Sequence, residues 1–401
     1  MQSQRGHLGR SLLRETLVRG AWLFAASWCA VLPAAPADSP ASTDSASPEG
    51  LLLKDYQPRS IFNVPETRVE KARFPVIDVH SHPYARTAEE VERWVRTMDA
   101  VGIARTVVMT GATGERFDEL YSLYGPHGDR FEMWCGVDYA GFDQPGFGPA
   151  AVAELERCFR AGAVGVGELS DKGGGLRRNS GGMHIDDPRM DPILEKCADL
   201  GLPVNVHVGE DRWMYEPMDA TNDGLMNASK WRIRGGPGIL GHDAVVATLA
   251  RAVKRHPRTT FIACHFANCC QDLMILGGML DASPNLYADI GARFGETSPI
   301  PRFMAGFYGR YQDRLLYGTD MGFDAEMYRT TFRILETEDE HFYARELFNY
   351  HWPLHGFGLP ETVLNKLYRA NALRLPRPPG PGRREGGDAA EPAAKPMQPE
   401  S

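Results

Sequence analysis

The sequence has few cysteines, no run of basic residues and no apolar run long enough for a membrane-spanning helix. Its seven cysteines follow no spacing typical of a disulfide framework, so we expect buried free thiols, although one or two disulfides stay open for an exported chain. Because no basic stripe offsets the net charge of −8, a nucleic-acid partner is not expected. The remaining composition, with 43% hydrophobic and 24% charged residues, is that of a globular protein with a substantial core.

The first 37 residues have the pattern of a secretory signal peptide. Several arginines precede the apolar run "AWLFAASWCAVL", and the small residues Ala35-Pro36-Ala37 follow it. The run is shorter than the about 20 residues that a membrane helix needs, which favours cleavage after Ala37 over a retained anchor. We therefore predict a secreted or periplasmic protein with no stable membrane span after cleavage of residues 1–37.

Two further segments have compositions typical of disorder. Residues 38–58 are rich in Ser, Pro, Ala and Asp, and residues 376–401 are rich in Pro and Gly. These boundaries predict a disordered linker over 38–58, one folded domain over 59–375 and a disordered tail over 376–401.

Within the folded domain, eight short apolar runs alternate with amphipathic helical segments. The runs cover residues 74–80, 103–110, 130–138, 163–169, 203–208, 259–266, 285–290 and 314–320. Alternating strands and helices predict parallel strands, and eight such units are the number that closes a (β/α)8 TIM barrel. Helices beyond the eighth strand, including 361–374, are expected to pack around the barrel. The main alternative in the α/β class is an open doubly wound sheet, but no Gly-rich phosphate loop follows the first strand.

The first strand ends in an unusual motif, "VIDVHSHP", at residues 76–83. Because side chains alternate along a strand, Asp78, His80 and His82 are expected on one face, with Cα atoms about 6.6 Å apart at each step. Two imidazoles on one face can share a metal ion. A single His-x-His pair is weak evidence, so the ends of the other strands decide its meaning.

Other expected strands also end in residues that can bind a metal or carry a proton. They are Glu168 at the fourth strand, His207 at the fifth, His265 at the sixth and Asp320 at the eighth. Alternation puts Glu168 on the face of Val166, and His265 on the face of Ala263. Because the carboxyl ends of barrel strands meet at one face, all these side chains are expected to converge there.

The ordered set "VIDVHSHP", "GVGEL", "VNVHV", "FIACHFAN" and "LLYGTD" resembles the amidohydrolase superfamily over residues 74–375. The similarity is to its amidohydrolase-related branch, which includes nonoxidative decarboxylases and hydrolases. It implies that one divalent metal, most often zinc, is held by His80, His82, His207 and Asp320. A set of three imidazoles and one carboxylate leaves positions open for water and substrate, as in catalytic zinc sites.

The resemblance also implies roles for the remaining residues of this set. Asp320 is predicted to exchange a proton with a metal-bound water, and His265 to orient or protonate a substrate oxygen. Glu168 is predicted either to bind a second metal or to contact the substrate or a ligand. Asp78 is expected to orient a histidine by a hydrogen bond.

The connection over residues 209–241 is unusually long and follows the fifth strand, at the face where barrel active sites lie. Its residues Trp213, Tyr215 and Trp231 are predicted to line a substrate pocket. Lys172 and Arg293, which follow the fourth and seventh strands, are predicted to meet a substrate anion.

These residues predict a metal-dependent hydrolase that acts on a small ester, lactone or amide through metal-activated water. The first alternative is a nonoxidative decarboxylase of a small carboxylic acid on the same barrel. The second is a non-catalytic binding protein that keeps the metal. The sequence gives no indication of the oligomeric state.

Overall fold

The computed structural model describes residues 47–176, 182–348 and 350–378. The expected signal peptide lies outside the described residues, as does nearly all of the expected tail. The chain divides into two compact units, residues 1–51 and 52–401, and the account below concerns the second unit. Of the expected linker, the described part carries two short 3-10 helices, Pro48–Gly50 and Leu53–Asp55.

In the described residues, every expected strand is present and all strand pairs are parallel. The strands are β1 Val76–Ser81, β2 Ile103–Met109, β3 Phe131–Trp134, β4 Val166–Asp171, β5 Val204–Val208, β6 Phe261–Ala263, β7 Leu286–Asp289 and β8 Leu315–Leu316. They form two ladders in sequence order, β1 to β3 and β4 to β8.

Backbone hydrogen bonds join the two ladders into a closed barrel. Between β3 and β4, Cys135 N donates to Gly165 O at 3.0 Å, and Gly167 N donates to Cys135 O at 2.9 Å. Between β1 and β8, Val79 N donates to Tyr317 O at 2.9 Å. The predicted α/β fold, a (β/α)8 TIM barrel, is therefore confirmed, and an open doubly wound sheet is excluded.

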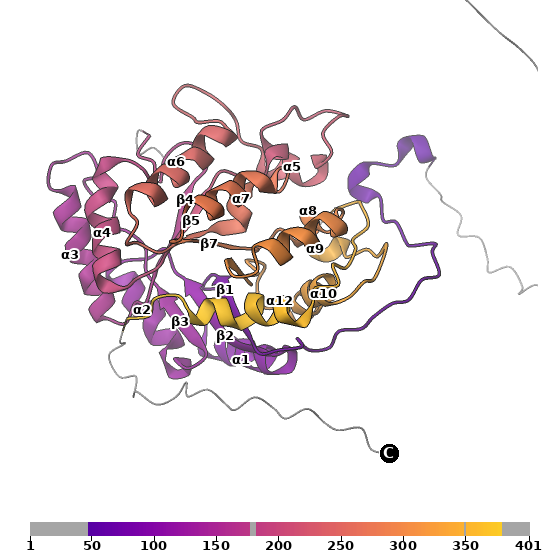
Figure 1. Cartoon of the computed structure of the whole chain (residues 1–401), viewed down its shortest axis with the longest axis horizontal. Coiled ribbons are helices and arrows are strands. Elements are labelled where there is room, and N and C mark those ends of the chain that lie inside the picture. The colour runs from indigo at the N-terminus through magenta and orange to yellow at the C-terminus, as the bar shows by residue number, and fades with distance from the viewer. Residues whose placement is uncertain (1–46, 177–181, 349, 379–401) are drawn as a thin grey trace, which may run out of the picture. The chain divides into compact units, whose positions relative to one another are not determined.

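Helices connect the strands and cover the barrel (Figure 1). They are α1 Ala88–Val101, α2 Gly114–Tyr124, α3 Phe147–Arg160, α4 Asp191–Leu200, α5 Leu225–Trp231, α6 His242–Arg255, α7 Leu273–Ala282, α8 Phe294–Thr297, α9 Pro301–Arg310, α10 Ala325–Glu336, α11 Arg345–Phe348, α12 Glu361–Asn365 and α13 Asn371–Leu373. The helix predicted over 361–374 is divided by a π-helical turn, Lys366–Ala370. The predicted extra C-terminal helices are thus present.

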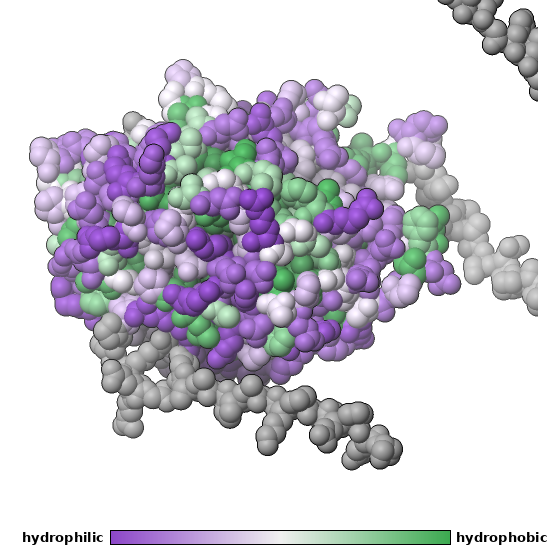
Figure 2. Space-filling model, in the orientation of Figure 1, coloured by the Kyte–Doolittle hydropathy of each residue, from purple (hydrophilic) through white to green (hydrophobic). Residues whose placement is uncertain are grey.

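Helix α1 shows how the sequence sets these elements. Thr87 caps its first turn by accepting a hydrogen bond from Glu90 N, and Gly102 ends it in the left-handed conformation at φ 91°. Between them, Val91, Trp94 and Met98 recur at helical spacing and are all buried. The outer faces of the helices meet solvent, and hydrophilic residues cover much of the face shown in Figure 2.

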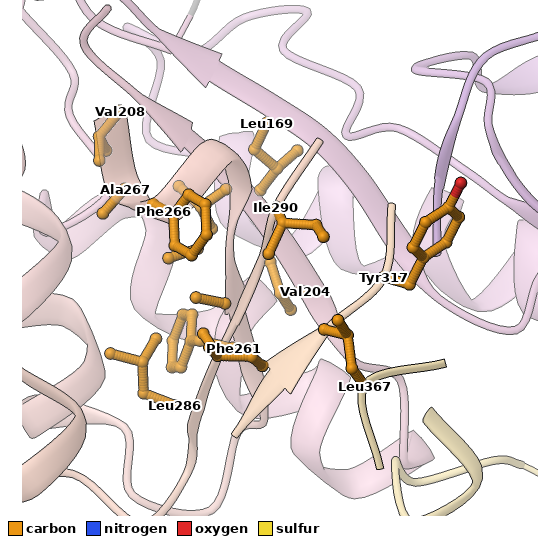
Figure 3. Close-up of a cluster of buried hydrophobic side chains, with 14 of the residues drawn as sticks. Leu169, Val204, Val208, Phe261, Phe266, Ala267, Leu286, Ile290, Tyr317 and Leu367 are labelled. Carbon is orange, nitrogen blue, oxygen red and sulfur yellow. The ribbon is translucent and has the colours of Figure 1, made fainter. Parts of the chain in front are cut away.

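The core between barrel and helices is built from every second residue of the strands. The strand register pairs Val204 with Phe261 and Phe261 with Leu286, and these three buried side chains group together in Figure 3. Full burial of each contributes about 1.5–3 kcal/mol. Because side chains alternate, the intervening residues Asn205 and His207 face the barrel interior.

Two sequence expectations about the wider chain can be compared with the described residues. The six cysteines within them are all buried and free, as expected for interior thiols. No described helix combines the length and the apolar character of a membrane span.

Candidate metal centre

Five predicted residues meet at the carboxyl ends of the strands, and we call them the histidine cluster: His80, His82, Glu168, His265 and Asp320. His82 Nε2 lies 3.2 Å from Asp320 Oδ1. His265 Nε2 lies 3.5 Å from Glu168 Oε1, and His80 Nε2 lies 3.7 Å from the same oxygen. The convergence predicted from strand ends is thus present in the structure.

The three imidazoles of the cluster are oriented in the same way. Each ring places Nδ1 against an oxygen that accepts a hydrogen bond, so Nδ1 carries a proton and Nε2 is the atom that faces the centre. The acceptors are Asp289 Oδ2 for His80 at 2.9 Å, Met109 O for His82 at 3.0 Å and Gly291 O for His265 at 2.7 Å. This is the arrangement in which histidines bind a metal through Nε2.

The electrostatics of the cluster favour a cation at its centre. Burial alone would lower the pKa of His80, but Asp289, Asp320 and Glu168 raise it to about 10. Burial likewise opposes ionisation of Asp320, yet the imidazoles around it hold its pKa below the ordinary value. The site therefore stabilises positive charge, which a divalent ion would supply.

The donor atoms fit a divalent metal ion. His80 Nε2 is buried and has no hydrogen-bond partner, an arrangement that costs free energy unless a ligand completes it. One atom each from His80, His82 and Asp320 lie within 4.8 Å of one another, as do atoms from His80, Glu168, Cys264 and His265. Imidazole and carboxylate donors suit zinc and manganese alike, so zinc stays a prediction.

His207 lies beside the histidine cluster with its ring turned differently. Its Nδ1 lies 2.6 Å from Glu168 Oε1, and its Nε2 lies 2.9 Å from Gly209 O. Because a carbonyl only accepts, Nε2 carries a proton and Nδ1 is the atom that faces the cluster. Burial lowers the pKa of His207, but Glu168 outweighs it and raises the pKa to about 9. Metal binding by His207 stays a prediction.

Simple strand alternation was wrong for two of these residues. Val166 and Ala263 pack in the core outside the barrel, whereas Glu168 and His265 face the cluster. In β4 the pairing register shifts between Val166 and Leu169. After β6, a 3-10 segment, Cys264–Asn268, has left-handed backbone angles from His265 onward, and this turn redirects the imidazole into the site.

A second correction concerns the residue that orients His80. Asp78 was expected to orient a histidine by a hydrogen bond, and the bonds that it accepts come from the backbone N–H of His80 at 3.1 Å and the hydroxyl of Thr319 at 2.6 Å. The carboxylate that bonds the ring is Asp289, at the end of β7. The sequence signal was available, because an aspartate in "NLYADI" ends a strand like the other cluster residues.

The amidohydrolase family matches residues 67–375 of the chain. The chain belongs to this family. Together with the donor atoms of the histidine cluster, the match identifies a metal-dependent enzyme. No curated protein matches the chain.

Several solved structures are similar to this amidohydrolase. A TIM-barrel protein from Bordetella bronchiseptica has 16% sequence identity, covers 75% of this chain and 97% of its own, and gives a TM-score of 0.46. A 2,6-dihydroxybenzoate decarboxylase from Rhizobium has 18% sequence identity, covers 75% of this chain and 98% of its own, and gives a TM-score of 0.46. A 5-carboxyvanillate decarboxylase from Novosphingobium aromaticivorans, complexed with manganese, has 13% sequence identity, covers 77% of this chain and 98% of its own, and gives a TM-score of 0.45. At these TM-scores the similarities carry no conclusion about activity.

A cavity of about 620 Å³ opens over the histidine cluster of the amidohydrolase. Besides His82, His265 and Asp320, its lining includes Tyr84, Lys172, Met214, Lys230, Trp231, Arg293, Phe348 and Tyr350. Lys172 and Trp231 are therefore where the sequence predicted them. Trp213 and Tyr215 instead pack against Trp352 and His242, with ring centroids 5.9 and 5.5 Å apart.

Arg293 lies on the wall of this cavity among three carboxylates, and we call these four residues the arginine cluster. Its Nε lies 3.0 Å from Asp211 Oδ2, its Nη2 lies 3.4 Å from Glu210 Oε2 and its Nη1 lies 3.6 Å from Glu296 Oε1. The charge predicted to meet a substrate anion is thus already neutralised by the protein. Sequence reasoning missed the partners, although Glu210 and Asp211 directly follow β5.

The arginine cluster is almost fully buried. Burial raises the pKa of Glu296 to about 8, against the opposing effect of Arg293. Glu296 also accepts a hydrogen bond from Tyr350 OH, and Glu210 contacts Lys172. Through Glu210, Arg293 and Glu296 the cluster forms part of the cavity wall.

Proposed function

We propose that this amidohydrolase is a nonoxidative decarboxylase of a small, flat carboxylic acid. The observation that supports the proposal is a lysine held against an aromatic ring in the cavity of the histidine cluster. Lys172 Nζ lies 5.4 Å from the centroid of the Trp231 ring, and both residues line the cavity. A flat acid needs both features, a cation for its carboxylate and an aromatic wall for its ring or double bond.

The ammonium group of Lys172 already has one partner within the protein. It contacts Glu210, but an ammonium group has three donors, so a substrate carboxylate can bind beside that contact. Lys230, next to Trp231 in α5, also lines the cavity and is exposed. Arg293 is not needed for this role, because its charge is taken up within the arginine cluster.

The reaction requires a group that delivers a proton to carbon. When the bond to the carboxyl group breaks, its electron pair stays on the substrate carbon, carbon dioxide leaves and a proton takes its place. Asp320 is placed to carry that proton, because Oδ1 accepts a hydrogen bond from Tyr84 OH at 3.0 Å and faces the cavity. As a carboxylate it first takes a proton from an acidic group of the substrate and then returns it to carbon.

A divalent ion, held by His80, His82 and Asp320, would supply a Lewis acid for the oxygens of the substrate. The imidazoles donate their Nδ1 protons to Asp289 Oδ2, Met109 O and Gly291 O, so their Nε2 atoms are held toward the position of the ion. The residues of this chain thus orient the substrate, hold the cation and move one proton.

The test follows labels in both carbon and hydrogen. The protein loaded with zinc or manganese is incubated in D2O with hydroxybenzoic and hydroxycinnamic acids that carry a 13C-labelled carboxyl group, because their hydroxyl group is the acidic group from which Asp320 would take the proton. We expect labelled carbon dioxide, and deuterium at the carbon that carried the carboxyl group. Lys172→Ala should raise KM, whereas Lys254→Ala, on the outer end of α6, should leave KM unchanged.

The hydrolase predicted from the sequence was favoured because of the expected export, and no described residue bears on export. Oxygen-18 from water entering the product of an ester, lactone or amide, with no carbon dioxide released from any acid, would contradict decarboxylation and support hydrolysis. Metal binding without turnover of any substrate would support the non-catalytic alternative.

A further inference from the structure

Cys264 lies at the inner edge of the histidine cluster, and the strand β6 places it there. Ile262 packs inside the barrel with Leu316, and Cys264, two residues further on, faces the same way by alternation. Its side chain is fully buried. Its Sγ lies within 4.8 Å of one donor atom each of His80, Glu168 and His265, and these three atoms also lie within 4.8 Å of one another.

We propose that Cys264 is a sulfur donor to the metal ion, so that the site prefers a thiophilic ion such as zinc over manganese. The inference rests on the metal-dependent function proposed above. Zinc bonds of about 2.3 Å to sulfur and about 2.0 Å to nitrogen put two such donors about 3.5 Å apart in a tetrahedral site. The donor atoms around Cys264 Sγ lie at most 4.8 Å apart, and small side-chain rotations would shorten these separations to about 3.5 Å.

A second observation points to the same place. His80 Nε2, one of the atoms near Cys264 Sγ, is buried without a partner. A buried imidazole nitrogen without a partner and a buried thiol within 4.8 Å of it are the donors of a mixed nitrogen and sulfur site. Soft sulfur ligands select zinc, whereas carboxylate and imidazole sites accept manganese as well.

The contacts of Cys264 describe its state before an ion binds. Its Sγ donates to Asn205 Oδ1, and the amide of Asn205 is fixed because Nδ2 donates to Asp289 Oδ2 at 3.2 Å. The thiol holds its proton in this arrangement. A thiol is a weak donor, so the contact is cheaply exchanged for a metal–sulfur bond, and the thiol proton leaves to solvent when the sulfur binds.

The test uses cobalt(II) as a spectroscopic substitute for zinc. One equivalent is added to the metal-free full chain, and absorption is recorded in the visible and near-ultraviolet. We expect d–d bands together with an intense thiolate-to-cobalt charge-transfer band. The Cys264→Ala variant should lose the charge-transfer band and keep d–d bands, because His80, His82 and Asp320 remain.

A matched control is Cys269→Ala, which removes a buried thiol outside the donor group and should keep both kinds of band. In competition experiments, Cys264→Ala should lower the affinity for zinc more than the affinity for manganese. Wild-type protein with d–d bands but no charge-transfer band would overturn the sulfur donor and leave the metal centre intact. No cobalt spectrum at all would overturn both the sulfur donor and the metal-dependent function.

Discussion

Two clusters of carboxylates share one cavity, and they differ in the source of their positive charge. In the arginine cluster, Arg293 supplies a permanent cation inside the protein. In the histidine cluster, Glu168 and Asp320 lie near imidazole Nε2 atoms, and His80 Nε2 has no hydrogen-bond partner. In the first cluster each carboxylate has the guanidinium of Arg293 within 3.6 Å, whereas the second cluster has no permanent cation and would be completed by an ion from outside. The carboxylates around Arg293 therefore belong to the wall of the cavity, whereas Glu168 and Asp320 are available for chemistry.

The two clusters are also in contact. His207 Nε2 lies 3.6 Å from Glu210 Oε1, while its Nδ1 faces Glu168. His207 therefore stands between them, and substitutions in one cluster must be checked for effects on the other.

The largest effect is expected from breaking the histidine cluster at Asp320. Asp320→Asn keeps the shape but removes the group that carries the proton, so kcat should fall by about 10²–10⁴-fold. Initial rates with the substrate found in the labelling experiment measure it. Asp324→Asn is the matched control, because asparagine caps α10 as well as aspartate does. An Asp320→Asn enzyme with at least half the activity would refute the assigned role.

The next effect is expected from breaking the arginine cluster. Arg293→Met leaves buried carboxylates without their cation and should lower the free energy of unfolding by about 3–5 kcal/mol, measured by urea denaturation. Arg310→Ala is the control, since its ion pair with Asp281 is more than half exposed and is worth about 0–1 kcal/mol. Equal stability losses in the two variants would show that the arginine cluster is not structural.

Metal addition should separate the clusters. At 100 times the dissociation constant, an ion that binds only the folded chain raises the free energy of unfolding by about 2.7 kcal/mol. We expect this increase in wild type and in Arg293→Met, but not in His80→Ala, when unfolding is followed with and without zinc. An equal increase in His80→Ala would place the ion elsewhere.

The smallest effect is expected at Asp289, which contacts the cluster through the ring of His80 and the backbone N–H of His265. In Asp289→Asn the amide hydrogens cannot accept the His80 Nδ1 proton, so the ring is pushed to the tautomer with a proton on Nε2. Metal affinity should fall by about 10–100-fold, as measured by calorimetric titration, with little change in kcat at saturating metal. Asp272→Asn, which keeps the cap of α7, should bind metal as wild type does.

The barrel and the convergence of the site residues were predictable because they depend on periodicity and chain order. The apolar runs gave all eight strands, and residues such as His80 and Asp320 at their carboxyl ends had to converge. What failed was alternation at Val166 and Ala263, where a register shift and a left-handed turn break the period of two. Neither irregularity changes the hydrophobic pattern of the sequence. The position of Cys264 beside the histidine cluster was therefore not predicted either.

The partners of charged residues were less predictable than the ligands. The position of Arg293 after β7 could be predicted from strand order, and it suggested contact with a substrate. The carboxylates that surround its side chain could not be predicted. Glu210 and Glu296 reach it from different loops, and loop conformation is not fixed by strand order. Asp289 could have been found, because it lies at a strand end like the residues that were recognised.

The most direct test of the account is the metal content of the chain after saturation with zinc and removal of excess ion, determined by mass spectrometry. We predict one ion per chain for wild type and for Arg293→Met, and none for the His80→Ala variant. Wild-type protein without bound metal, or a His80→Ala variant with the same content as wild type, would contradict the assignment of the histidine cluster as the metal centre.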